Sequence, residues 1–244
     1  MKTLYVFGCS FATPNFCVEP KKSFWGAAAC DLKVDKIVNF AHSGFSLDIL
    51  IHILLNEHID FENNYLLFGI PPLARINIFQ DQSPPIEHFY KQYDKDFNEL
   101  DFGQKSLTNV RWLGYDELFG DEKKFIGNLD YNWLTVESLN KVLLLHNYLT
   151  SKKINFIIAN LTVPMLYQDP WPTGEEIMRK TKDLKSCILF KDTPWDTNKH
   201  DNIKPVDRDP SDPDCWYGHH GAEGNLNWYN KVLKRKMQEL QWIQ

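Results

Sequence analysis

The chain has 244 residues, of which 43% are hydrophobic and 24% are charged, a balance typical of a globular protein with a substantial core. Its net charge of −5 at pH 7 argues against nucleic acid as a partner, because no basic block offsets the acidic excess. No stretch approaches the roughly 20 apolar residues that a membrane-spanning helix needs, so no membrane association is expected.

The five cysteines contain no Cys-x-x-Cys pair, and their odd number favours reduced thiols over a disulfide framework. Cys215 lies near His219 and His220, but no second ligand pair accompanies them, so a zinc site is not expected. The sequence contains no other motif that indicates a cofactor. The first residues lack the apolar stretch and cleavage site of a signal peptide. The sequence therefore predicts a cytoplasmic protein that needs neither metal nor organic cofactor.

Short apolar runs alternate with helix-like segments in the first part of the chain. Residues 4–7 form the first expected strand, and a helix is expected over residues 23–32. A second strand over residues 36–40 leads to a helix over residues 46–55, whose apolar side chains follow helical spacing. Residues 65–69 form a third strand. Continuous apolar strands interleaved with helices indicate βαβ units in a parallel sheet that is covered on both faces.

The middle of the chain is polar and aromatic. Residues 78–130 show weak periodicity, so we predict an insertion that lies over the sheet. The regular pattern resumes with a helix over residues 134–151 and a strand over residues 154–159. A second insertion is expected over residues 162–185, with a short helix at 175–184.

The last part of the chain completes the alternation. Residues 187–190 are the fifth expected strand, residues 192–214 are a loop rich in Pro and Asp, and residues 222–240 are an amphipathic helix. The sequence thus predicts one domain, residues 1–244, with a three-layer α/β/α fold and about five parallel strands.

Ser10 follows the first expected strand directly, in the run Gly-Cys-Ser. Ligands of open α/β sheets bind at the carboxyl ends of the strands, and glycine permits a tight turn there. A serine nucleophile needs a base, which the doublet His219-His220 near the other end of the chain could supply. The alternative is that Ser10 only caps the next segment, since serine is a favoured N-cap residue.

Other residues could complete a hydrolytic site. The backbone N–H groups of Ser10 and Gly44 would form an oxyanion hole. His219 could remove the proton from Ser10 and return it to the leaving group. An upstream acid could orient the imidazole: Asp209, Asp212 or Asp214. His42, beside Gly44, either touches substrate or makes a structural hydrogen bond.

Three blocks in this order resemble the SGNH/GDSL hydrolases, a superfamily of serine esterases, lipases and deacetylases. Its usual Gly-Asp-Ser block is Gly8-Cys9-Ser10 here, a variant associated with phage-encoded and uncharacterised bacterial members. Its Asn-x-Ala-x-x-Gly-x-Ser block is matched by residues 39–46, and its last block, His-Pro-x-x-x-Gly, is similar to residues 219–224. The resemblance implies a flavodoxin-like fold, Ser10 as nucleophile, His219 rather than His220 as base, and a bacterial or host cytoplasm.

Two positions depart from the family pattern. The Asn of its Gly-x-Asn-Asp block supplies an oxyanion donor, whereas this chain has Pro71 there. Arg75, shortly after, either reaches the substrate or forms a surface salt bridge. The orienting Asp normally stands three residues before the His, where this chain has Trp216; Asp214 or a backbone carbonyl would take its role.

The leading expectation is a serine esterase or deacetylase that acts on a small-molecule or carbohydrate ester, with O-acylated sugars as a plausible target because flat rings stack on Trp and Tyr. The alternative is a catalytically silent domain of the same fold that binds a carbohydrate or a protein, as in phage–host interaction. The sequence does not indicate the acyl group or the oligomeric state.

Overall fold

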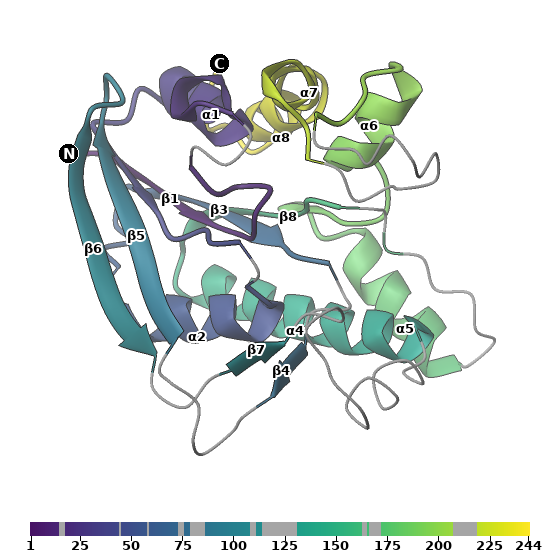
Figure 1. Ribbon diagram of the computed structural model, residues 1–244. Coiled ribbons are helices and arrows are strands. Elements are labelled where there is room, and N and C mark those ends of the chain that lie inside the picture. The colour runs from purple at the N-terminus through teal and green to yellow at the C-terminus, as the bar shows by residue number, and fades with distance from the viewer. Residues whose placement is uncertain are drawn as a thin grey trace.

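A sheet with helices on both faces forms the centre of the molecule in the computed structural model (Figure 1). The structure describes residues 1–14, 18–43, 45–57, 59–72, 76–78, 86–107, 111–113, 131–162, 165, 172–206 and 219–244. The strands lie in the order β6-β5-β2-β1-β3-β8-β9.

Five strands of this sheet are parallel, as the sequence predicts. They are β1 (Thr3–Phe7), β2 (Lys36–Asn39), β3 (Tyr65–Ile70), β8 (Asn155–Asn160) and β9 (Cys187–Ile188). Their spatial order, 2-1-3-4-5 along the chain, is that of flavodoxin-like folds. Because β1 lies between β2 and β3, the turn that follows β1 emerges near the middle of the carboxyl edge.

The two faces of the sheet are covered by different helices (Figure 1). One layer contains α2 (Leu47–Asn56), α4 (Tyr131–Ser151) and α5 (Pro172–Lys182); the opposite layer contains α1 (Phe24–Leu32), α7 (Ala222–Trp228) and α8 (Lys234–Glu239). Successive residues of a strand pack against opposite helix layers. Phe7 of β1 packs in the core with α2 and α4, whereas Val6 packs in the core with α1 and α8. This alternation gives the expected α/β/α sandwich.

The predicted position of part of the first insertion is wrong. Residues expected to lie over the sheet instead extend it, because β5 (Ile86–Asp94) pairs antiparallel with β2, and β6 (Glu99–Leu107) pairs with β5. Tyr93, near the end of β5, is only 2% exposed, so this end of the strand packs into the core. β4 (Ile76–Ile78) and β7 (Arg111–Leu113) form a separate two-stranded sheet.

Side-chain caps fix the starts of the predicted helices. The Ser23 hydroxyl accepts a hydrogen bond from the Gly26 N–H of α1, and Ser46 accepts one from the Ile49 N–H of α2. α1 is preceded by a short 3-10 turn, η1 (Pro20–Lys22). No helix in the described ranges is long and apolar enough to cross a membrane.

The expectation of a continuous loop after β9 is also wrong. It contains α6 (Pro194–His200), whose N-cap Thr193 accepts a hydrogen bond from the Asp196 N–H at 3.2 Å. Proline in the first turn, an early acid and basic residues in the last turn favour this helix. The abundance of Pro and Asp in the segment concealed these signals.

The final predicted helix is confirmed, with one irregularity. α7 and α8 are joined without a break by a π-helical turn, η3 (Tyr229–Leu233). The Tyr229 hydroxyl donates a 2.6 Å hydrogen bond to Asp31 Oδ2 of α1. Burial, reinforced by this carboxylate, raises the pKa of Tyr229 well above its ordinary value.

Candidate active site

The structure brings Ser10 and His219 together, although 209 positions separate them in the chain. Ser10 Oγ lies 2.7 Å from His219 Nε2, and the Ser10 side chain is almost wholly buried. The contact has the length of a strong hydrogen bond between a hydroxyl and an imidazole. At this distance the imidazole can accept the proton of the serine hydroxyl, which activates the serine oxygen as a nucleophile.

A tight turn after β1 positions Ser10. The Ala12 N–H donates to the Cys9 carbonyl at 2.9 Å, and the Thr13 hydroxyl donates to the same oxygen at 3.1 Å. A Cβ added at Gly8 would lie 2.9 Å from the Ala12 Cβ, so the turn leaves little room for a larger residue. Cys9 is fully buried, which separates its thiol from the reactive face of the turn.

Asn39, at the end of β2, fastens this turn to the neighbouring strand. Its Nδ2 donates to the Ala12 carbonyl at 3.0 Å, while its Oδ1 accepts from the Ala41 N–H at 2.8 Å. The side chain is 1% exposed, so both hydrogen bonds are shielded from water. Asn39 is a positioning residue for Ser10, and its signal in the sequence was a lone asparagine at the end of an apolar strand.

His219 is held by contacts on its backbone and on its ring. Its carbonyl accepts a 2.8 Å hydrogen bond from the Val206 N–H. The Phe11 ring lies against the imidazole, with 4.6 Å between centroids and 37° between planes. The imidazole is therefore presented to Ser10 from the segment that leads into α7.

Asn225, in the first turns of α7, ties this segment to α1. Its Oδ1 accepts from the Phe24 N–H at 3.2 Å, and its Nδ2 donates to the His220 and Gly221 carbonyls at 2.7 and 3.1 Å. Sequence reasoning missed this residue, because nothing in a helical asparagine indicates a partner 201 positions away. Gly224 is tightly enclosed as well, since an added Cβ would lie 2.8 Å from the His220 Cβ.

The other expected site residues have different outcomes. His220 is buried and lines the same cavity, but His219 is the histidine whose Nε2 atom contacts Ser10 Oγ. The Nδ1 atom of His42 lies 2.8 Å from the Ser43 carbonyl, and its ring lies against Phe45. This is the structural hydrogen bond that was one of the two expectations for His42.

Several predicted site residues, and residues near them, lie outside the part of the chain that the structure describes. These are Gly44, Arg75, the acids Asp209, Asp212 and Asp214, and Trp216 with Cys215. In the described part of the chain, the Ser10 N–H has no hydrogen-bond acceptor. That amide is one donor that a developing oxyanion would need.

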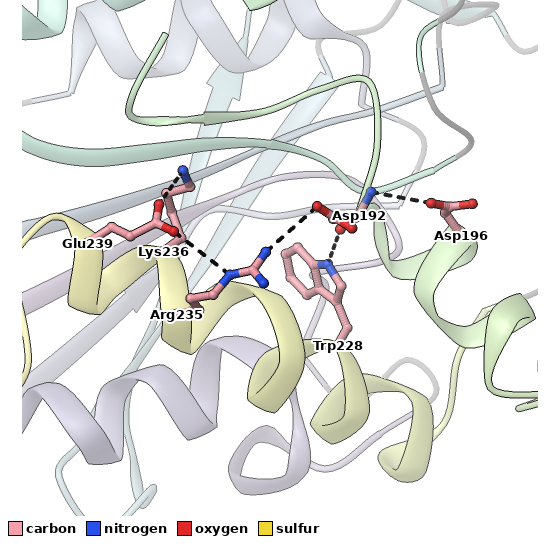
Figure 2. A network of polar contacts seen from close by, with 6 residues as sticks. All are labelled: Asp192, Asp196, Trp228, Arg235, Lys236 and Glu239. Atoms are coloured by element: carbon pink, nitrogen blue, oxygen red, sulfur yellow. Dashed lines mark hydrogen bonds and ion pairs between the residues drawn. The ribbon is translucent and has the colours of Figure 1, made fainter. Parts of the chain in front are cut away.

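A small cavity, lined by both polar and apolar side chains, adjoins Ser10 and His219. Its volume is about 20 Å³, room for about one water molecule, and its walls include Phe24, Leu161 and Trp228. The Trp228 indole N–H donates to the Asp192 carbonyl at 2.8 Å (Figure 2). The Trp228 ring also meets Phe24 edge to face. The wall is therefore fixed in place, and the space beside the serine suits a small group.

Among the described residues, no group of three or more His, Cys, Asp or Glu side chains could hold a metal ion. Compared with known proteins, the chain matches no protein-family model and no curated protein sequence. The site is accordingly interpreted from its own geometry.

Proposed function

We propose that this protein is a serine acyl hydrolase of the SGNH/GDSL type, an esterase or deacetylase that acts on small-molecule or carbohydrate esters. The observation that carries the proposal is the 2.7 Å contact between Ser10 Oγ and His219 Nε2. Its position after the central strand β1 of a sheet with flavodoxin-like order supports the same assignment.

In the proposed reaction, His219 accepts the proton of Ser10 as Oγ attacks the ester carbonyl. The Ser10 N–H, together with the N–H of Gly44, stabilises the oxyanion. His219 then protonates the departing alcohol, which leaves an acyl group on Ser10. Water, deprotonated by His219, attacks this acyl-enzyme and releases the acid. Asp214 is the proposed group that orients the imidazole.

The small cavity supports a short acyl group. An acetyl methyl fits a space of about 20 Å³, whereas a long chain does not. Acetylated sugars remain the proposed substrate class, with the aromatic residues of the insertion as the surface for the sugar ring.

The proposal is tested by labelling with a fluorophosphonate, which reacts with activated serines. We expect wild-type protein to be labelled and to cleave p-nitrophenyl acetate, and Ser10→Ala to lose both properties. Ser151→Ala, at the exposed end of α4, is the matched control and should behave as wild type. Equal labelling of wild type and Ser10→Ala would remove the basis of the proposal.

One observation favours a second candidate, a catalytically silent domain that binds a carbohydrate or a protein. Pro71, directly after β3, has neither a side-chain amide nor a backbone N–H to donate to an oxyanion. Loss of one oxyanion donor costs about 3 kcal/mol of transition-state stabilisation. Failure of wild-type protein both to label and to cleave acetyl esters would favour this second function.

A further inference from the structure

Another cavity formed by described residues lies away from Ser10. It is a groove of about 460 Å³ between the β9 strand and α8, closed at one end by the residues that follow α5. Cavities of this size commonly hold a small organic ligand. Asp192 lines this groove, which we call the β9 groove, and Trp228 lines the catalytic cavity. The Trp228 indole N–H donates to the Asp192 carbonyl (Figure 2).

The floor of the β9 groove is apolar. Ile188, Leu189 and Val232 are each at least 94% buried, and Phe190 adds a partly buried ring. Ile188 and Val232 belong to the core cluster on one face of the sheet, and Leu189 and Phe190 belong to the cluster on the other face, so the floor consists of packed core side chains and is preformed. It offers a surface for the apolar body of a ligand.

The rim of the groove is basic. Five cationic side chains line it: Lys182, Lys185, Lys191, Arg235 and Lys236. Three acidic ones accompany them: Asp183, Asp192 and Glu239. This local excess of two positive charges contrasts with the net charge of −5 for the whole chain, and a cleft with excess charge of one sign concentrates ions of the other sign.

Much of this positive charge is not neutralised. No described residue forms an ion pair with Lys182, Lys185 or Lys191. Arg235 touches Asp192 and Glu239 only at the long distance of 3.8 Å and is 63% exposed, whereas Lys236 holds Glu239 at 2.8 Å (Figure 2). Three lysines and a loosely held guanidinium are thus available to an anionic group of a ligand.

We propose that the β9 groove binds an amphiphilic organic anion, a carboxylate, sulfate or phosphate carried on an acyl or aromatic body. The apolar floor takes the body, and the lysines at the rim take the charged head. The site is separate from the catalytic cavity and does not rest on the hydrolase proposal.

The test is a titration of ¹⁵N-labelled protein with decanoate, followed by NMR. We expect amide signals of Leu189 and Val232 to shift, in wild type and equally in Ser10→Ala. Acetate carries the carboxylate of decanoate but lacks its alkyl chain, whereas decyl maltoside carries an alkyl chain of the same length but no charge. Each should bind at least about tenfold more weakly than decanoate.

The variant Lys185→Glu/Lys191→Glu reverses two exposed charges at the rim, and it should weaken decanoate binding by about tenfold. Lys95→Glu, in the turn between β5 and β6, is the matched control and should change it less than twofold. Circular dichroism would establish that both variants are folded.

Three results would overturn the proposal: shifts confined to residues around Ser10, equal binding of decyl maltoside or acetate, or unchanged affinity in the double variant. Binding of decanoate with loss of every hydrolase signal would leave this site intact and remove only the proposed reaction.

Discussion

The turn that carries Ser10 and the segment that carries His219 reach the same point of the fold by different means. Hydrogen bonds among residues 9–13, with Asn39 from the next strand, fix the serine. The histidine depends on Val206 and on Asn225, whose bond to Phe24 spans most of the chain. The nucleophile is therefore set locally, whereas the base is set by long-range packing.

The largest effect is expected when the Ser10–His219 pair is disrupted. His219→Ala removes the proposed base while the Ser10 turn stays in place, so p-nitrophenyl acetate hydrolysis should fall by about 10³-fold. The fluorophosphonate labelling rate should fall with it. His200→Ala, on an exposed ring at the end of α6, is the control. Equal rates in wild type and His219→Ala would assign the base to another group.

The second effect concerns the cavity that both segments enclose, with Phe11 on the serine side and Trp228 on the histidine side. If it receives the acyl group, p-nitrophenyl octanoate should react about 100-fold more slowly than the acetate, because a long chain would overpack the space. Initial rates with acetate, butyrate and octanoate measure this. Similar rates along the series would place the acyl group elsewhere.

The third prediction sharpens the contrast between local and long-range control. Asn225→Ala removes three buried hydrogen bonds around the start of α7, and it should lower the free energy of unfolding by about 2 kcal/mol. Hydrolysis under native conditions should fall as well, because His219 loses its support. Urea unfolding curves give the first quantity.

Asn230→Ala, on an exposed position of the same helix, is the matched control and should leave both values unchanged. If Asn225→Ala is less stable but hydrolyses the ester at the wild-type rate, Asn225 does not position His219.

The smallest effect is expected at Asp201, which joins α6 to the final helix. Lys231 and Asn227, both donating to this carboxylate at 2.6 Å, lower the pKa of Asp201 to about 2. Because the folded-state pKa is depressed, the stabilisation is present above the unfolded value of about 3.9 and is lost as pH falls toward 2. Asp201→Asn should therefore be less stable than wild type at pH 7, and the difference should close between pH 4 and pH 2. Urea midpoints across this range measure it, and a constant difference would contradict it.

The sequence predicted a strand or a helix correctly where the residues that indicate it lie in the same segment of the chain. The apolar run before Ser10 predicted β1, and Ser23 and Ser46 marked the starts of α1 and α2. The resemblance of residues 219–224 to the last block of the SGNH/GDSL pattern also predicted that His219 meets Ser10.

Features that depend on distant partners were not predictable in this way. The residues of β5 show no clear period of two, and nothing in them reveals that β2 is the neighbour of β5 and that the sheet continues past β2. In the sequence, Asn225 is indistinguishable from any other polar residue of a helix, because its hydrogen bond with Phe24 depends on the tertiary fold. The cap signals of α6 were present at Thr193 and Pro194, yet a short helix cannot be distinguished from a turn without the α7 surface on which it packs.

The π-helical turn η3 has a consequence for how the last helix can vary. A π turn holds one residue more than a regular helical turn, so the additional residue is absorbed within η3 and the helical faces that carry Trp228 before it and Met237 after it stay aligned. Deleting Asn230 would regularise the helix and leave the residues beyond it on the same faces, whereas deleting a residue within α8 would rotate everything beyond it by about 100°. A homologous chain can therefore lack one residue at η3 and keep both sets of contacts.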